Sequence, residues 1–520
     1  MTSRQDLFAQ LTSTASFDIA IIGGGATGLG VALDAAARGF KVVLFESHDF
    51  AKGTSSRATK LVHGGVRYLA QGNISLVREA LHERTTLLAN APHIAQPLPF
   101  VMPSYAWWQA PFYGIGLKMY DLLAGKAGLG RTEFLNRSET LKLLPNARES
   151  GLTGGVKYWD GQFDDARLAL ALAKTAAERS ALLINYCAAT GLIHEGGKVA
   201  GLQVQDKETG QSYSVKATCV INAAGVWVDE FRQMDGDQTK RPVKNMVAPS
   251  QGTHLVVDRE FMPSDHAILI PKTADGRVLF IVPWLGKLIL GTTDSPRDDL
   301  AREPTAFKDD TGFILGEAAK YLTRAPQRSD VKSIWVGLRP LVKPPDEDGG
   351  NTKKLSREHT ILVSKSGLLT VTGGKWTTYR AMAEDVLDNA FEAKLLPQRP
   401  GAVTVKLPLA GSLTTQKRIS DAPGLHMYGN ESVKVQAMPG AANELCPGLT
   451  EAMVRYAARF EYARTVEDML ARRSRLLFLD AKLAAQMAQS VATILQEETG
   501  VDPQRDAFLA LAKQYATLPE

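Results

Sequence analysis

The stretch FDIAIIGGGATGLGVALDAAARGFKVVLFE (residues 17–46) decides the fold of the first part of the chain. It predicts a hydrophobic strand, a glycine-rich turn, a helix of small residues and a second strand, which together form a βαβ unit. Gly23 makes the tight turn, Gly25 lets the backbone approach a pyrophosphate, and Gly28 lets the helix pack against the strand. The helix N-terminus offers N–H groups and a partial positive charge to that pyrophosphate. Glu46 follows Gly28 by 18 residues, where an acid can bind a ribose, so the unit predicts a bound dinucleotide, either NAD or FAD.

Length and composition are typical of a multidomain globular enzyme. The 520 residues predict two to four domains, and the net charge of +5 permits an anionic substrate or membrane surface without requiring either. The sequence has no long basic tract and no zinc-ligand spacing, so neither nucleic acid nor a metal site is expected. The three cysteines, Cys187, Cys219 and Cys446, lack CxxC spacing and are expected to be buried, reduced thiols.

Membrane association, if any, is expected to be peripheral and on the cytoplasmic side. The sequence has no run of about 18 apolar residues, and residues 1–17 lack the apolar core of a signal peptide. Residues 107–120 (WWQAPFYGIGLKMY) are aromatic and amphipathic, which is typical either of an interfacial helix or of a buried helix covering the active site. For the basic stretch at 472–475 (RRSR), a solvent-exposed, salt-bridged helix face is the expected explanation.

Hydrophobic periodicity predicts an α/β plus α+β fold. Helical spacing at 164–183 and strand-like segments at 184–222 extend the first sheet, and a strand at 368–373 returns the chain to it. Alternating segments at 253–291 predict an antiparallel sheet in a second, interleaved domain. The expected division is an N-terminal lead at 1–17; a Rossmann-like dinucleotide-binding domain at 18–90, 150–235 and 355–395; a substrate domain at 91–149 and 236–354; a linker at 396–408; and a helical C-terminal domain at 409–520.

A second glycine-rich segment, GTSSRATKLVHGGVRYL (residues 53–69), follows Glu46 closely. Its hydroxyl residues and double glycine can bring backbone N–H groups against a cofactor, and Arg67 and Tyr68 can project into a site. A nicotinamide dehydrogenase does not need such a segment at this position, whereas a flavin held along its whole length benefits from one. The segment therefore favours a flavin, with an ordinary polar loop as the alternative.

Four later residues each follow a strand or lie among glycines: His254, Asp294, Arg339 and Lys375. Singly, each has a structural explanation, as a core histidine, a turn residue or a member of an ion pair. Together with Arg67, however, Arg339 and Lys375 offer three cations. A phosphate carries about −1.5 to −2 charge at neutral pH, and arginine binds it through a two-pronged fork where lysine offers a point charge. Convergence of these residues would predict a phosphate-bearing substrate.

The chain resembles the FAD-dependent glycerol-3-phosphate dehydrogenases, within the D-amino-acid-oxidase-like flavoproteins. The most specific segments are HGGVRYL (63–69), GLRPL (337–341) and GGKWTTYR (373–380), and the similarity is collinear over about residues 18–480. The resemblance implies non-covalent FAD, an FAD-binding domain, an antiparallel-sheet substrate domain and an all-helical C-terminal domain. It also implies oxidation of sn-glycerol 3-phosphate to dihydroxyacetone phosphate, by hydride transfer from C2 to flavin N5. Electrons would pass to a membrane quinone, and the chain could form a homodimer.

Carried over residue by residue, the resemblance places the substrate site on Arg67, Tyr68, His254, Arg339 and Lys375, the last three being catalytic. His254 is the expected base, and nearby arginines should lower its pKa and keep it neutral. The expected flavin contacts are Gly23, Gly25, Ala26, Thr27, Gly28, Glu46, Ser47, Thr54, Ser55, Ser56, His63, Gly64, Gly65, Ala188, Ala224, Gly225, Arg339, Gly374, Lys375, Trp376 and Thr377.

Three alternatives stay open at the level of sequence. A flavin oxidase for an amino or hydroxy acid could hold a carboxylate with Arg67 and Tyr68. An enzyme acting on glycerol 3-phosphate could pass its electrons to O₂ in place of quinone. A non-catalytic regulatory protein could bind a flavin or NAD without turnover.

Overall fold

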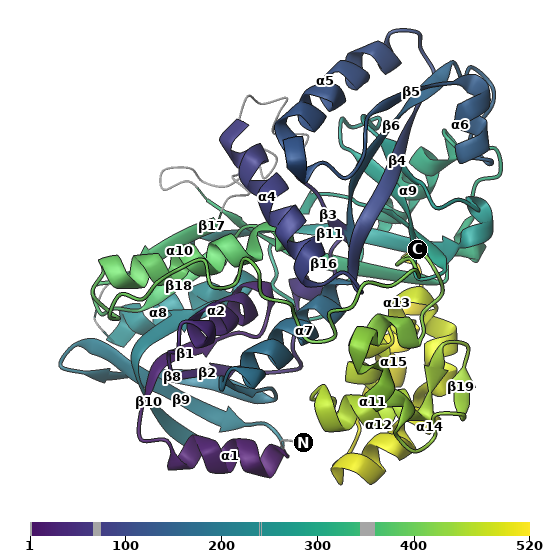
Figure 1. The fold of residues 1–520 in the computed structure, drawn as a ribbon. Coiled ribbons are helices and arrows are strands. Elements are labelled where there is room, and N and C mark those ends of the chain that lie inside the picture. The colour runs from purple at the N-terminus through teal and green to yellow at the C-terminus, as the bar shows by residue number, and fades with distance from the viewer. Residues whose placement is uncertain (1–2, 66–73, 239, 241, 344–358) are drawn as a thin grey trace.

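Two large sheets and a C-terminal group of helices make up the protein (Figure 1). The computed structural model describes residues 3–65, 74–238, 240, 242–343 and 359–520. The first sheet has the order β17-β18-β10-β1-β2-β7, with β9 added beside β10 and β8 beside β9. Its strands are β1 (Phe17–Ile22), β2 (Val42–Phe45), β7 (Leu182–Ile184), β8 (Cys187–Glu195), β9 (Lys198–Asp206), β10 (Ser212–Asn222), β17 (His359–Val363) and β18 (Leu369–Gly373).

The centre of the first sheet is parallel. β1 pairs in parallel with β2 and β10, and β10 pairs in parallel with β18, so the carboxyl ends of four strands meet at one edge. Ligands of doubly wound sheets bind at that edge. The return of the chain to this sheet through β18 is confirmed, and the last part of the strand-like region predicted at 184–222 forms the single strand β10.

Alternate residues of β1 face two different layers. Ile19 and Ile21 pack against the helices α2 (Ala26–Ala37), α7 (Asp165–Glu178) and α10 (Tyr379–Glu392). Ala20 and Ile22 face the opposite side, where α1 (Arg4–Ser13) and the β8–β9 hairpin cover the sheet. A sheet buried on both faces explains why its strands read as continuous apolar runs. The N-cap of α7 is Asp164, whose side chain accepts hydrogen bonds from the N–H groups of Ala166 and Arg167, as its sequence position predicts.

The second sheet has ten strands in the order β15-β11-β14-β13-β12-β4-β6-β3, with β16 beside β11 and β5 beside β6. Its pairs are antiparallel except β12 with β4, which is parallel. The strands are β3 (Leu61–Val62), β4 (Ala95–Ser104), β5 (Glu133–Asn136), β6 (Gly154–Phe163), β11 (Val247–Asp258), β12 (Ala267–Ile270), β13 (Leu279–Trp284), β14 (Lys287–Gly291), β15 (Ser295–Pro296) and β16 (Ser333–Val342). The helices around it are α4 (Ile74–Asn90), α5 (Gln109–Ala124), α6 (Arg137–Leu143) and α9 (Lys308–Ala319), and α8 (Val228–Gln238) lies beside the first sheet.

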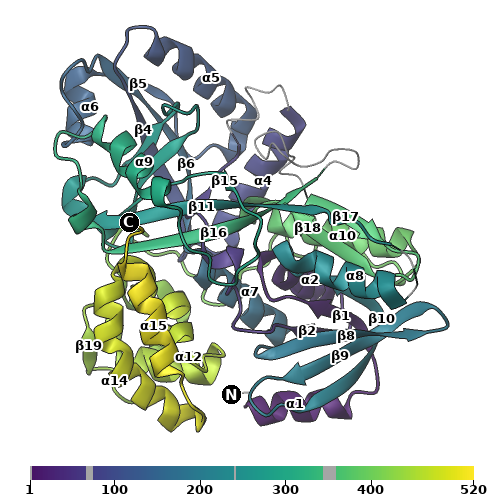
Figure 2. The ribbon, with the colours of Figure 1, turned by 180° about the vertical axis from the view of Figure 1, so that it is seen from behind.

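The C-terminal part is helical apart from a two-stranded ribbon. It packs below the second sheet and to the side of the first, beside α7 and β16 (Figures 1 and 2). Its elements are α11 (Ser432–Gln436), β19 (Glu444–Cys446), β20 (Leu449–Thr450), α12 (Glu451–Phe460), one π-helical turn η9 (Asp468–Arg473), α13 (Leu476–Leu479), α14 (Ala481–Thr499) and α15 (Arg505–Ala516).

The prediction of an exposed basic helix face at 472–475 is wrong. Arg472 and Arg473 are 2% exposed, and Arg475 is fully buried. They point out of the C-terminal helices into the first-sheet domain, where carboxylates pair with them. The prediction for the cysteines is confirmed, since Cys187, Cys219 and Cys446 are buried free thiols.

The aromatic segment at 107–120 forms the start of α5. One side of this helix is buried through Leu117, Tyr120 and Ala124. The other side is exposed: Phe112 is 66% exposed and Leu122 81%, and Trp107, in the turn before the helix, is 83% exposed. The interpretation as a buried helix covering the active site is therefore wrong, because one side of α5 is exposed. No helix among the described residues is both long and apolar enough to cross a bilayer.

Candidate active site

A cavity of about 570 Å³ lies between the two sheets. Its wall begins at the glycine turn after β1, follows the end of β2 and the 3₁₀ turn η1 (Thr54–Ser56), and includes the turn after β18. Its other end is formed by β11 and β16 of the second sheet, at His254 and Arg339. One continuous space thus joins the dinucleotide-binding motif to the predicted substrate residues.

The glycine turn has the geometry that a pyrophosphate requires. Gly23 has φ +104°, and a Cβ there would lie 2.6 Å from the carbonyl oxygen of Ala223. A Cβ on Gly28 would lie 1.9 Å from the carbonyl oxygen of Gly23, so only glycine lets α2 pack this closely. Gly25 is the N-cap of α2 and offers no side-chain hydrogen bond, which leaves the helix N-terminus facing the cavity.

Glu46 lies in the cavity wall at the end of β2. Its carboxylate accepts hydrogen bonds from the N–H groups of Gly24 (2.7 Å) and His48 (2.9 Å). Burial raises the pKa of Glu46, and these two bonds oppose that shift. The acid is therefore held rigidly against the glycine turn, at the position where the sequence predicts a ribose contact.

The loop after Glu46 is tied to the same turn through Ser55. The Ser55 hydroxyl accepts a hydrogen bond from the N–H of Ala26 at 2.9 Å, and its carbonyl oxygen accepts one from Trp376 Nε1 at 2.9 Å. Thr377 Oγ1 lies 3.4 Å from the carbonyl oxygen of His63. Three segments far apart in the sequence thus form one cradle, as expected for a cofactor held over much of its length.

The expected flavin contacts fall into two groups. Those that line the cavity are Gly23, Gly25, Ala26, Thr27, Glu46, Ser47, Thr54, Ser55, His63, Ala188, Ala224, Gly225, Arg339, Gly374, Lys375, Trp376 and Thr377. The other four described residues, Gly28, Ser56, Gly64 and Gly65, are not part of the cavity lining. Arg67 and Tyr68 fall outside the described residues.

His254 lies on β11 with its ring stacked on that of Trp335, the ring centroids being 4.0 Å apart. Its Nε2 is 3.0 Å from Thr59 Oγ1. Burial, followed by the charges of Lys60 and Arg339, holds the pKa of His254 well below 6.5. The ring is therefore neutral at physiological pH and can accept a proton, as predicted, although burial contributes more to this than the neighbouring cations.

Arg339 enters the same end of the cavity from β16. Its guanidinium donates to Asp294 Oδ1 (3.0 Å), Thr292 Oγ1 (3.2 Å) and the carbonyl oxygen of Thr293 (3.1 Å). The side chain is 24% exposed. Asp294, which the sequence left open as a turn residue, also accepts a hydrogen bond from Ser250. Arg339 is thus both a member of an ion pair and part of the cavity wall, while Lys375 enters the wall at the end of β18.

Sequence reasoning missed several residues near the site. Arg302 lines the cavity with its guanidinium 3.7 Å from the ring centroid of Trp227, and it lies in a segment without a motif. Lys60 is buried beside Asp165, and burial, offset in part by that carboxylate, lowers its pKa to about 7. Lys60 lies inside the second glycine-rich segment, so the sequence did indicate that it lies near the site. The sequence did not indicate that Asp165 is its partner.

The chain matches known proteins over both of its parts. The profile described as "FAD dependent oxidoreductase" matches residues 18–380, and "C-terminal domain of alpha-glycerophosphate oxidase" matches residues 403–506. Mitochondrial glycerol-3-phosphate dehydrogenase of Rattus norvegicus is 41% identical over 95% of this chain and 72% of its own length. The probable mitochondrial glycerol-3-phosphate dehydrogenase of Caenorhabditis elegans is 42% identical over 96% of this chain and 73% of its own length.

Solved structures give the same result. The glycerol-3-phosphate dehydrogenase from Bacillus halodurans complexed with FAD is 29% identical, with a TM-score of 0.78 over 100% of this chain and 99% of that one. L-α-glycerophosphate oxidase from Mycoplasma pneumoniae, with a TM-score of 0.57 and 18% identity, shares the fold over 76% of this chain and 98% of its own. With the sequence matches, this shows that the chain belongs to the FAD-dependent glycerol-3-phosphate dehydrogenase family.

Proposed function

We propose that this protein oxidises sn-glycerol 3-phosphate to dihydroxyacetone phosphate with FAD held non-covalently in the cavity between the sheets. The observation that carries the proposal is the single cavity that joins the Gly23–Thr27 turn to His254 and Arg339. When bound, the flavin supplies the redox chemistry as a hydride acceptor at N5. The protein supplies the orientation of the substrate and a group that takes the hydroxyl proton.

Arg339 is the proposed anchor for the substrate phosphate. The carboxylate of Asp294 and the carbonyl oxygen of Thr293 hold its guanidinium in place, so little side-chain freedom is lost when a phosphate binds. A fixed guanidinium binds a phosphate through two parallel, charge-assisted hydrogen bonds. Lys375 adds a second positive charge at the cavity wall. Holding the phosphate fixes the secondary alcohol in one orientation, which lowers the entropic cost of reaction.

His254 is the proposed base. It is neutral because of its burial, and it lies on the strand that pairs with the strand of Arg339, with Ser250 directly opposite Arg339 in the register. A neutral imidazole within reach of the C2 hydroxyl can take its proton. Thr59 contacts the edge of the ring and Trp335 stacks on its face. These contacts hold the ring, and with it the nitrogen that accepts the proton, in one position.

The rival activities differ in substrate. Under anaerobic conditions, sn-glycerol 3-phosphate should remove the flavin absorbance, whereas glycine, D-alanine and glycolate should leave it unchanged. If an amino or hydroxy acid bleached the flavin and glycerol 3-phosphate did not, the protein would be an amino or hydroxy acid oxidase. An unchanged spectrum with every compound, from a chain that does bind FAD, would support a regulatory role.

We further propose that the acceptor is a membrane quinone and that the exposed face of α5 rests on the membrane. Trp108, Phe112, Ile115, Met119 and Leu122 recur at helical spacing on this face, and all are exposed. The helix lies at the outer end of the second sheet, away from the C-terminal helices (Figures 1 and 2). Aromatic and aliphatic side chains on one face of a helix, flanked by the exposed Lys118, are typical of interfacial binding.

Replacing Phe112, Ile115 and Leu122 together by glutamine should weaken binding to anionic lipid vesicles about tenfold or more, because each variant side chain gains less free energy when it is buried in the membrane. Turnover with quinone carried in those vesicles should fall in parallel, while turnover with a water-soluble dye stays near the wild-type value. Val433→Gln, which changes an exposed apolar residue of the C-terminal domain, is the matched control. If the triple variant bound vesicles as tightly as wild type, the exposed face of α5 would not be the membrane-binding surface. Stoichiometric peroxide without quinone reduction by wild type would show an oxidase.

A further inference from the structure

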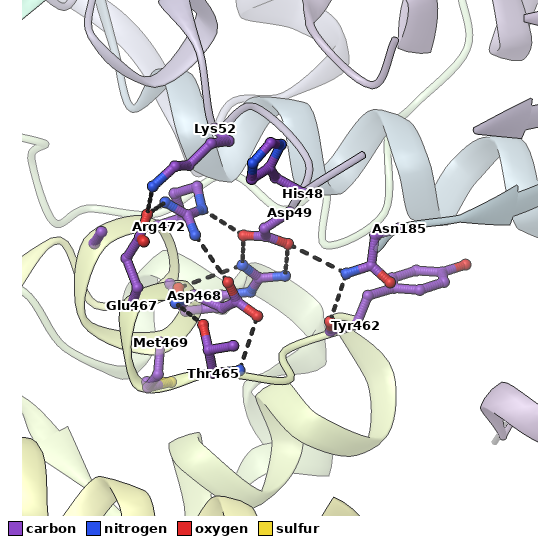
Figure 3. A network of polar contacts seen from close by, with 12 residues as sticks. His48, Asp49, Lys52, Asn185, Tyr462, Thr465, Glu467, Asp468, Met469 and Arg472 are labelled. Carbon is purple, nitrogen blue, oxygen red and sulfur yellow. Dashed lines mark hydrogen bonds and ion pairs between the residues drawn. The ribbon is translucent and has the colours of Figure 1, made fainter. Parts of the chain in front are cut away.

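The C-terminal domain reaches the cofactor site through three buried arginines. The π-helical turn η9 and the residues after it carry Arg472, Arg473 and Arg475, and their side chains leave the C-terminal helices for the first-sheet domain. Figure 3 shows the part of this network around Asp49, with Asp49 facing Arg472 and Lys52 facing Glu467. Charged groups are buried only where partners compensate them, so the position of each arginine is strongly constrained.

Asp49 is the centre of the first contact. Arg473 Nη2 donates to Asp49 Oδ1 at 2.9 Å, Arg473 Nη1 donates to Oδ2, and Arg472 Nε also donates to Oδ2. Burial alone would raise the pKa of Asp49, but the two arginines more than offset it, so the carboxyl stays ionised. Arg472 is itself held by Glu467 at 2.7 Å and Asp468 at 2.8 Å.

Asp49 belongs to the loop that carries the ribose acid. Glu46, Ser47, His48, Ala51 and Lys52 all line the cavity, whereas Asp49 points away from it toward the arginines. The N–H of Ala51 donates to the carbonyl oxygen of Gly24 at 2.9 Å, which ties this loop to the glycine turn. Lys52 in turn pairs with Glu467 of the C-terminal domain. One face of the loop therefore contacts the cofactor cavity, and the other contacts the C-terminal domain.

Arg475 makes the second contact. Its Nη2 donates to the carbonyl oxygen of Ser56 at 2.8 Å and to Asp165 Oδ1 at 3.1 Å. Lys60 donates to the same carbonyl oxygen at 2.8 Å and to both oxygens of Asp165. Ser56 directly follows Ser55, the residue that bonds to the start of α2. The loop that carries Ser55 and Ser56 is thus also fixed by a contact with the C-terminal domain.

We infer that the C-terminal domain sets the affinity for FAD by fixing these two loops, with Arg473 and Asp49 as the main positioning pair. The inference rests on the flavin site of the proposed function, but it needs neither the substrate nor the acceptor. Arg472, Arg473 and Arg475 are positioning residues, since none of them lines the cavity and each acts on it through the residues that it contacts, chiefly Asp49 and Ser56. By linkage, bound FAD must stabilise the docked C-terminal domain by the same factor that docking adds to FAD affinity.

The test is FAD binding by the full-length apoprotein, followed by flavin fluorescence. Arg473→Lys keeps the charge but loses the two-pronged contact, and it should weaken FAD binding about tenfold to hundredfold, as loss of a charge-assisted hydrogen bond implies. Asp49→Asn/Arg473→Gln removes both charges of the pair and leaves Arg472 with Glu467 and Asp468 as partners. It should show the same loss, while Arg459→Ala, whose partner Glu498 lies within the C-terminal domain, should match wild type.

Thermal unfolding of each apoprotein separates positioning from general destabilisation. If Arg473→Lys and Arg459→Ala lower the melting temperature by the same amount, Arg473→Lys should still lose more of its affinity for FAD. FAD should also protect the linker at 396–408 from protease in wild type, and this protection should weaken in the paired variant. FAD affinity within about twofold of wild type in Arg473→Lys would overturn the inference. An affinity loss in Arg459→Ala of the same size would also overturn it. A wild-type apoprotein that bound no FAD would instead contradict the proposed function.

Discussion

Arg339→Ala is expected to lower kcat/KM for sn-glycerol 3-phosphate by about 10²- to 10⁴-fold. Two charge-assisted hydrogen bonds to the phosphate would be lost, each contributing about 1.5–3 kcal/mol, and each 1.36 kcal/mol corresponds to a factor of about ten. Most of the loss should be in KM, because the phosphate is remote from the carbon that reacts. Steady-state kinetics with a water-soluble acceptor measure both constants.

The control for this variant is Arg297→Ala. Arg297 lies near the same strands, bonded to Gln251 and Asp299, and lies outside the lining of the cavity. It should leave KM near the wild-type value, and Arg339→Lys should fall between wild type and alanine because it keeps the charge but not the fork. Unchanged kinetics in Arg339→Ala would show that Arg339 does not anchor the substrate phosphate.

His254→Ala should slow flavin reduction by glycerol 3-phosphate about 10²- to 10⁴-fold, the range typical of general-base catalysis. FAD affinity should change little, since His254 lies at the end of the cavity that we propose holds the substrate. Anaerobic rapid mixing, followed at the flavin absorbance, measures this step apart from reoxidation. His82→Ala, at a side chain 63% exposed on α4, is the control and should reduce at the wild-type rate.

The pH dependence gives an independent check on the same base. Because burial and nearby cations lower the pKa of His254 well below 6.5, the neutral form dominates at pH 6.5 and above. Reduction by wild type should therefore stay constant as pH falls through 6.5 and should decline only at a pH well below it. A decline centred near pH 6.5 would show that the base is a different, more exposed group.

Local backbone chemistry explains what the sequence could predict. The turn at Gly23 and the close packing at Gly28 require glycine, so the βαβ unit is legible from residue type and spacing. Asp164, the first residue of the helical spacing at 164–183, caps α7 as its residue type implies. His254 and Arg339 are 85 residues apart, and nothing in that spacing indicates that they share a site. The family resemblance provided that prediction.

Long-range electrostatics explains most of what the sequence could not predict. A run of basic residues is usually solvated, and only the fold reveals that Asp49 lies opposite Arg473, 424 residues later in the chain. The same holds for Lys60, whose partner Asp165 lies 105 residues away. Helix α15 falls within the predicted helical C-terminal domain, but only the fold reveals that it packs against α14 and β16.

The most direct test of the central claim is anaerobic titration of the purified, FAD-loaded protein with sn-glycerol 3-phosphate. The oxidised flavin spectrum should disappear, and dihydroxyacetone phosphate should appear in equal amount to the flavin reduced, because one substrate molecule supplies both electrons. An oxidised spectrum that persists at saturating sn-glycerol 3-phosphate would contradict the central claim.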